Sequence, residues 1–185
     1  MQRLTRYGGI LASVILIAFG IGAVYMGIDG RNYVRDNLAA EKIVGTEDSS
    51  IPGQKVDTGS EAQAFADVMR KHTLEATGGQ TYAEMPRFMG KNGQPTNDEK
   101  AAALTPKGTP QDNPARQIWV TQTALSNALN MSYFAEQVAL FSIVMGVALL
   151  LTGVGFGIVS IRLLRRREPE SVTDRVAPRS AVAAH

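Results

Sequence analysis

The sequence predicts an all-α membrane protein: a two-transmembrane helical hairpin whose long helices extend outside the membrane, with a small helical insertion there. Two uncharged apolar runs are the main basis for this prediction: Gly8–Ile28 has 21 residues and Val138–Ile161 has 24. A helix rises about 1.5 Å per residue and the hydrocarbon core of a bilayer is roughly 30 Å thick, so each run is long enough to cross it. The mean hydropathy of −0.06 hides both runs, because the segment between them is polar.

The first apolar run fits two hypotheses. Arg3 and Arg6 precede it, as basic residues precede the apolar core of a secretory signal peptide, and Gly20-Ile21-Gly22 offers a small-residue cleavage site. The run is longer than the roughly 7–15 residues of such a core, and the following residues stay compatible with a helix through Lys42. An uncleaved anchor is therefore the favoured hypothesis, and a cleaved signal peptide is the alternative.

Arginines precede the first run and follow the second. Because Lys and Arg are retained on the cytoplasmic side of a membrane, both termini are expected in the cytoplasm. The expected segments are a cytoplasmic N-terminus (1–7), transmembrane helices (8–28 and 138–161), an extracytoplasmic region (29–137) and a basic, disordered cytoplasmic tail (162–185). The residues expected to set this topology and to contact lipid are Arg3, Arg6, Arg162, Arg165, Arg166 and Arg167.

Small residues recur at helical spacing within both runs. They let helix backbones approach closely in lipid, where the hydrophobic effect does not drive helices together. Glycine is also common in membrane helices generally, so packing of the two runs, packing on a partner and no packing role stay open alternatives. The candidate helix-packing residues are Gly146, Gly153, Gly157, Ala18 and Gly22, and Gly9 with Ser13 repeats the spacing.

Two helices are expected within the outside region. Ser60-Glu61-Ala62-Gln63 fits a capping box and predicts a helix over about residues 61–77 that ends at Gly78-Gly79. Asn113-Pro114 is typical of a helix start, so a stalk helix is expected from residue 114 into the second apolar run. The expected apolar faces comprise Phe65, Val68, Met69, His72 and Ala76 on the first helix, and Ile118, Leu125 and Leu129 with Trp119, Thr121 and Ala128 on the second.

Residues 86–112 are expected to form a flexible loop, because four prolines and three glycines interrupt a polar sequence. A short helix over Asn97–Leu104 is the one element considered within it. Leu, Ile, Val and Phe make up only 11 of the 84 residues from Gly30 to Asn113. This share is below the roughly 20% at which a chain struggles to build a core, so the outside region is expected to depend on the stalk or on a partner.

Residue types exclude several kinds of site. The chain has no Cys and only two His, so a Cys nucleophile, a Cys zinc site and a three-His zinc site are excluded, and a two-His iron site is not expected because His185 is the last residue. Neither a phosphate-binding loop nor a nucleophile elbow occurs. A formal net charge of +2 argues against a strongly basic nucleic-acid binder. No catalytic residue, cofactor or metal is therefore expected, with His72 and Glu75 as a minor alternative for acid–base chemistry.

Two hypotheses of function remain. The first is a non-enzymatic integral membrane accessory protein, a small subunit or an assembly or stabilising factor of a larger membrane complex. The alternative is a membrane-anchored extracytoplasmic sensor or ligand-binding module. The expected partners are membrane lipids and another integral membrane protein or complex, without nucleic acid. Candidate partner contacts are Phe65, His72, Tyr82 and Trp119, although packing in a small core is the simpler interpretation of Tyr82 and Trp119.

Two segments, AQAFADVMRKHTLEATGGQTYAEM and NPARQIWVTQTALSNAL, resemble a group of small actinobacterial two-span membrane proteins. Those proteins share a KHxLExTGGxTYAE stretch and a (D/N)PxRQ helix start. The resemblance covers about half of the chain, which departs from the group by the insertion Pro86–Asp112. It implies the two-span topology and no activity. Some members are labelled aromatic ring-opening dioxygenases, but the iron ligands of such an enzyme are missing from this sequence.

We expect the mature protein to retain the first apolar run. Intact-mass measurement of protein purified from membranes should therefore give the full 19.9 kDa chain. A mature chain that starts near Ala23 would show that the run is a cleaved signal peptide, and it would overturn the two-span hairpin.

Overall fold

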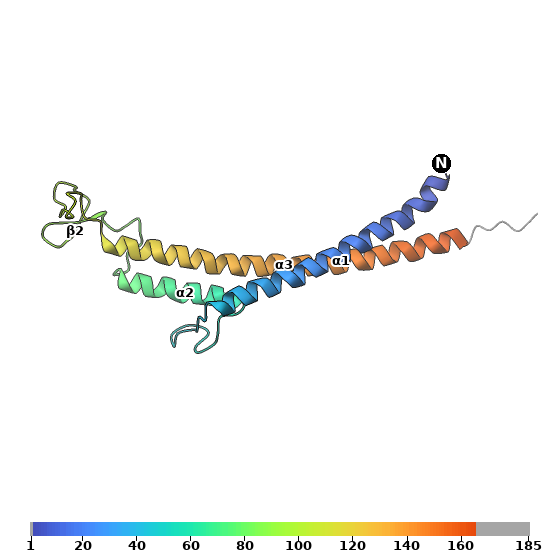
Figure 1. Ribbon diagram of the computed structural model, residues 1–185, viewed down its shortest axis with the longest axis horizontal. Coiled ribbons are helices and arrows are strands. Elements are labelled where there is room, and N and C mark those ends of the chain that lie inside the picture. The colour runs from blue at the N-terminus through green and yellow to red at the C-terminus, as the bar shows by residue number, and fades with distance from the viewer. Residues whose placement is uncertain (1, 166–185) are drawn as a thin grey trace, which may run out of the picture. The chain divides into compact units, whose positions relative to one another are not determined.

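The computed structural model describes residues 2–165, with side chains described for residues 7–162 (Figure 1). Within this range α1 spans Gln2–Ala40, α2 spans Gly59–Ala76 and α3 spans Pro114–Arg165. Strands β1 (Phe88–Met89) and β2 (Pro95–Thr96) have two residues each. The predicted all-α class is therefore confirmed. Contacts divide the described residues into two compact units, one of residues 2–22 with 146–165 and one of residues 23–145.

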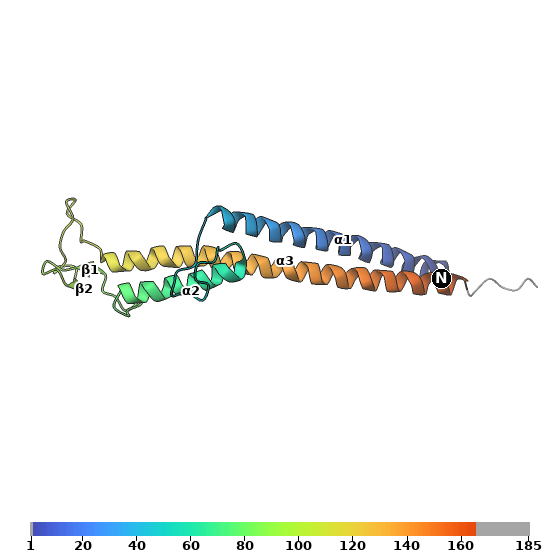
Figure 2. The same cartoon turned by 90° about the horizontal axis from the view of Figure 1, so that it is seen from below.

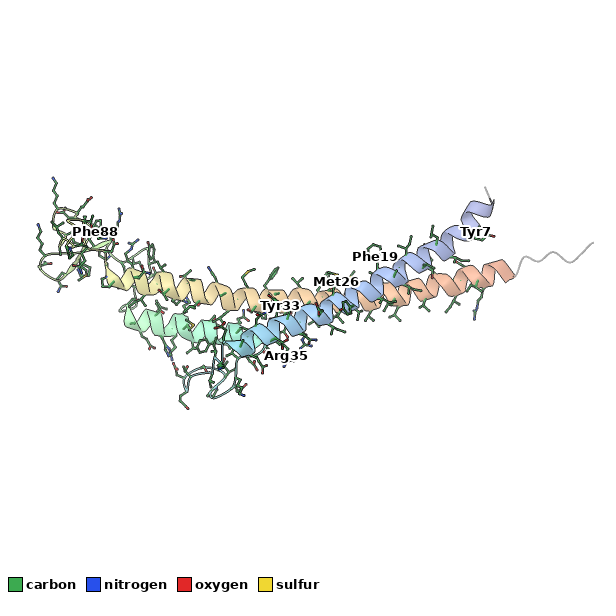
Figure 3. The ribbon with its side chains drawn as sticks, in the orientation of Figure 1. Tyr7, Phe19, Met26, Tyr33, Arg35 and Phe88 are labelled. Atoms are coloured by element: carbon green, nitrogen blue, oxygen red, sulfur yellow. The ribbon has the colours of Figure 1, made fainter. Side chains whose placement is uncertain are left out.

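Both α1 and α3 are long and apolar enough to cross a membrane. Only 11% of the most apolar window of α1 and 17% of that of α3 are buried. A core helix of a soluble protein would be mostly buried, so these apolar surfaces need a covering of another kind. Figure 3 labels Tyr7, Phe19, Met26 and Tyr33 along α1, each at least 69% exposed.

In the first unit, α1 packs on α3 through small residues. A Cβ at Gly20 would lie 2.8 Å from the carbonyl oxygen of Gly146, and one at Gly153 would lie 2.8 Å from Cγ1 of Ile17. The hydroxyl of Ser13 donates a 2.6 Å hydrogen bond to the carbonyl of Gly153. Gly146, Gly153 and Gly157 all lie at this interface, whose contacts on the α1 side come from Gly9, Ser13, Ile17 and Gly20.

Ala18 and Gly22 do not lie at the interface. Ala18 is exposed, and nothing is within 4 Å of a Cβ built at Gly22. Their spacing of four residues is correct for close packing, but they occupy a different face of α1 from Ser13 and Gly20. The face that packs repeats every seven residues, as it does in left-handed helix pairs.

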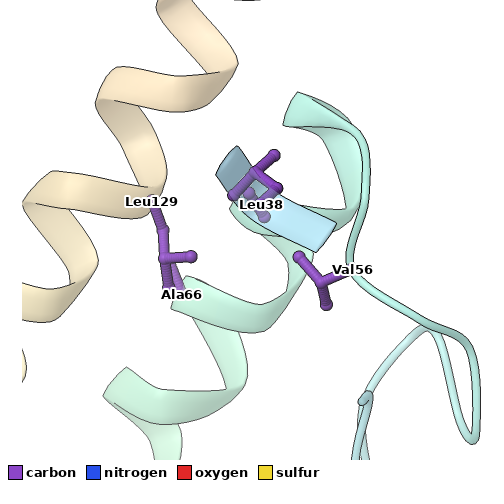
Figure 4. Close-up of a cluster of buried hydrophobic side chains, with 5 residues drawn as sticks. Leu38, Val56, Ala66 and Leu129 are labelled. Carbon is purple, nitrogen blue, oxygen red and sulfur yellow. The ribbon is translucent and has the colours of Figure 1, made fainter. Parts of the chain in front are cut away.

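The second unit contains α2 packed beside the N-terminal half of α3 (Figure 2). Its core is small and draws on α1, the segment after it, α2 and α3 (Figure 4). This arrangement agrees with a region too poor in apolar residues to build a core without the stalk. The core residues are Leu38, Val56, Ala62, Ala66 and Leu129, with Val34, Ile43, Ile51, Phe65 and Met69 packed against them.

The capping box of α2 lies two residues before the predicted one. Thr58 is the N-cap; its hydroxyl accepts from the backbone N–H of Glu61, and the Glu61 carboxylate accepts from the N–H of Thr58 at 2.9 Å. Ser60 and Gln63 match the same pattern, but Gly59 already begins the helix because its N–H is hydrogen-bonded to Glu136 on α3. The predicted end is close: Thr77 caps the helix, and Gly78 and Gly79 follow with positive φ.

The expected apolar faces are also partly wrong. On α2, His72 and Ala76 are exposed, and small residues such as Ala62 and Ala66 face α3 instead. On α3, Leu129 and Trp119 are buried, whereas Leu125 is 50% exposed and Ile118 is 44% exposed. These four residues belong to the expected apolar face of α3. Leu125 and Ile118 are the part of that face that no other described element covers.

Residues 86–112 form a compact β-paired segment, not the expected loop. β1 pairs with β2 in antiparallel register, and isolated bridges join Gly90 to Ala102 and Leu104 to Pro110. The predicted helix over Asn97–Leu104 is absent. The side chain of Asp98 accepts the backbone N–H of Lys100, a local pattern that competes with helix formation.

Two glycines on α1 allow a matched test of the interface. We expect Gly20→Ala to destabilise the protein by about 1–3 kcal/mol, because its Cβ would be forced against the backbone of Gly146. Gly22→Ala adds the same methyl group to open space and should be neutral or slightly stabilising. Unfolding of the detergent-solubilised protein in an SDS titration checks both. Equal effects would contradict the packing.

Candidate functional site

Glu136 occupies the junction of the three helices in the second unit. It is 7% exposed and is the one buried charged residue among the side chains described. Its Oε1 accepts a hydrogen bond from Nε of Arg31 on α1 at 3.0 Å, and its Oε2 accepts one from the backbone N–H of Gly59 on α2 at 2.7 Å. The free N–H groups and the dipole at the start of a helix favour a carboxylate at this position.

Gly59 is needed for this close approach. A Cβ there would lie 2.7 Å from Cα of Tyr133 and 2.9 Å from Oε2 of Glu136. Because the nearest atom belongs to the backbone of α3, no small side-chain movement would relieve the clash. Each oxygen of the Glu136 carboxylate has a donor from the protein, so this group connects α1 and α2 to α3.

His72 is bound to Asp48, not to Glu75 on its own helix. Its Nε2 lies 2.9 Å from Oδ2 of Asp48, and the ammonium of Lys71 lies 2.8 Å from the same oxygen. The hydrogen bond from Lys71 holds the pKa of the Asp48 carboxyl well below its usual range, with further contributions from His72 and Thr46. Asp48, Lys71 and His72 are substantially exposed, so they attach the segment after α1 to α2 without forming an enclosed site.

The candidate contact residues Trp119, Tyr82 and Phe65 lie in different surroundings. Trp119 is 4% exposed, and its indole N–H donates to the carbonyl of Gln80 at 2.9 Å. Trp119 is therefore a core residue and not a surface contact. Tyr82 is 45% exposed, and the guanidinium of Arg116 lies 3.9 Å from the centre of its ring. Phe65 is partly buried at the edge of the core.

Phe65 borders an open apolar groove that the sequence analysis did not identify. A cavity of about 560 Å³ lies between the end of α1, α2 and α3, and a second of about 440 Å³ lies between α2 and α3. Met69 and Leu125 line both, so the two are adjacent; we call them together the outer groove. Each has the size of a ligand pocket, and α3 contributes Ile118, Leu125 and Leu129 to the lining.

The part of α3 that borders the groove carries no charge. Residues 117–135 are 19 consecutive residues without Asp, Glu, Lys, Arg or His. Their exposed side chains are both apolar and polar: Ile118, Val120, Leu125, Met131 and Phe134 are apolar, and Gln117, Thr121, Thr123, Asn127 and Asn130 are polar. A helix that faces only water normally carries charges on its outer face, so this stretch is typical of a surface that is covered. The absence of charge is the sequence signal that could have predicted this surface.

The remaining candidate residues are arginines near the two ends of the chain. Arg162 is exposed, whereas the side chains of Arg3, Arg6 and Arg165–Arg167 and the rest of the tail lie outside the described residues. Within the described residues, His, Asp and Glu form no group of three that could hold a metal ion.

A comparison of the chain with known protein families, with curated proteins and with solved structures finds no match. The resemblance to actinobacterial two-span proteins therefore stays a prediction.

Removing the Glu136 carboxylate tests the junction. We expect Glu136→Ala to reduce the free energy of unfolding by about 2–3 kcal/mol, because it leaves the N–H of Gly59 and the guanidinium of Arg31 without their acceptor. Asp57→Ala is the matched control: it removes an exposed ion pair with Arg35 and should cost less than about 1 kcal/mol. Thermal unfolding followed by circular dichroism measures both. A cost for Glu136→Ala no larger than the control would refute the junction's role.

Proposed function

We propose that the protein is a non-enzymatic integral membrane accessory protein that assembles or stabilises a larger membrane complex. The observation that carries this proposal is the uncharged, exposed stretch of α3 over residues 117–135. Ile118 and Leu125 are 44% and 50% exposed, seven residues apart on one face of a segment outside the apolar run 138–161. Apolar surface of this kind is typical of protein interaction sites.

The proposed topology has both termini in the cytoplasm and residues 29–137 outside. The arginines that precede the first apolar run and follow the second support this topology. The ion pair of Arg31 and Glu136 adds support, because Arg31 follows the first run by three residues and Glu136 precedes the second by two. Charged groups at matching positions on both helices are expected where two spans leave the hydrocarbon core together.

The arrangement of the ionisable groups supports a non-enzymatic role. The Glu136 carboxylate is occupied by two donors from the protein, and His72 is bound to an exposed aspartate outside any enclosed pocket. Catalytic acids and bases usually lie in clefts that restrict water. For an enzyme with His72 as its acid–base group, His72→Ala would abolish activity.

The cavity of about 560 Å³ favours one alternative function, a sensor or binding module for a small apolar ligand. The two functions differ in what stabilises the outside region. A sensor would show a thermal transition that shifts with a small molecule, whereas an accessory protein would be stabilised by its partner chain.

We expect the protein to be recovered as part of a complex. Cross-linking in intact membranes through outside lysines such as Lys71 and Lys91, then mild solubilisation and native mass spectrometry, should give a fixed stoichiometry of the 19.9 kDa chain with at least one other membrane protein. A second preparation without cross-linker controls for random collisions. A monodisperse, partner-free monomer with a well-folded outside region would contradict the proposal.

A further inference from the structure

In the second unit, α1 follows a regular line along α3. Gly27 packs against Ala139, where a Cβ on the glycine would lie 2.7 Å from the carbonyl oxygen. One turn farther along, Arg31 pairs with Glu136, and Leu38 shares the core with Leu129, seven residues from Glu136. The steps of three and then seven residues on α3 are those of two helices that pack along their length.

This line continues on α3 after α1 has ended. Steps of seven from Ala139 lead to Ser132, Leu125 and Ile118, which span about 21 Å of helix. The last helical residue of α1 is Ala40, and Lys42 turns the chain away with a φ of 55°. The part of α3 that would contact a longer α1 is therefore left open.

The open part of the line is the outer groove. Leu125 and Ile118 remain 50% and 44% exposed at positions where a helix packed along α3 would bury them. Met69 on α2 forms the opposite wall, and Leu38 marks the end next to α1. The groove thus begins beside the end of α1 and extends along α3 as far as Ile118.

We propose that the outer groove binds one apolar-faced helix of a partner membrane protein, laid along α3 beyond the end of α1. This inference rests on the proposed function and names its docking surface. Grooves of this kind take amphipathic helices through apolar residues spaced by three, four and seven. Continuity with the α1–α3 interface is the main argument, because the same line on α3 already holds one helix in this protein.

The charges of the groove specify the partner helix further. Glu41 is the one charged residue among the lining residues described, and it lies at the end of α1, where free backbone carbonyls also place negative charge. The rest of the lining is uncharged. The partner helix therefore carries a Lys or Arg at the end next to α1 and an uncharged face along Leu125 and Ile118.

A photo-cross-linking residue tests the docking directly. p-Benzoylphenylalanine replaces Ile118 or Leu125 in the full chain, in the membranes of its host cell. Val120 and Met131 are the matched controls: they are 48% and 62% exposed on α3 and do not line the groove. After irradiation, we expect adducts at 118 and 125 to map to one segment of one other protein, about seven residues apart. Adducts to lipid alone, to a second copy of this chain, equally at the controls, or none at all would overturn the inference.

A blocking variant separates this inference from the proposed function. Leu125→Lys places a charge in the groove, and Met131→Lys places one on the other face of the same helix. We expect Leu125→Lys to lower the recovered complex by about tenfold or more relative to Met131→Lys, while the melting temperatures of the two purified variants agree. A complex that survives Leu125→Lys refutes the groove and leaves the proposed function standing. Absence of a complex with the unmodified chain refutes both.

Discussion

The arrangement of the second unit depends on one buried carboxylate. Glu136 accepts a hydrogen bond from α1 through Arg31 and from the first N–H of α2 through Gly59, and it thereby joins three helices at one point. Burying a charge is unfavourable unless its oxygens are paired, so this contact holds each of the three backbones near one position. The bonded N–H of Gly59 is at the first residue of α2, directly after the N-cap Thr58. The small core around Leu129 and Ala66 is assembled next to this junction.

The residues at seven-residue steps along α3 change from small to large. In the first unit they include Gly146 and Gly153, which allow backbones to approach in a region with no charged groups. In the second unit they include Ala139 and then the large side chains of Leu125 and Ile118. Small residues suit a partner helix that is part of the same chain and packs tightly, whereas large exposed residues suit an occupant that supplies apolar surface of its own. This change is the physical basis for regarding the outer groove as a binding surface.

Local sequence signals predicted the elements whose ends depend on nearby residues. Asn113 caps α3, with its side-chain oxygen 3.0 Å from the N–H of Ala115, and the glycines after Thr77 end α2. The errors have a common cause. Ser60 matches a capping box as well as Thr58 does, and Ala18 with Gly22 matches a packing motif as well as Gly9 with Ser13 does. Only contacts with α3 distinguish the members of each pair. The pairing of residues 86–112 was missed because isolated bridges leave little alternation in the sequence.

The sequence by itself determined the two long apolar helices, the start of α3 and the absence of Cys- or His-rich sites, because uncharged length, a capping residue and residue types are local properties. The tertiary structure alone decided which face of each helix is covered. A helical stripe shows which residues can be buried together, but whether they are buried depends on where a neighbouring helix ends. Because α1 stops at Ala40, Leu129 is buried while Leu125, one turn away, lines an open groove.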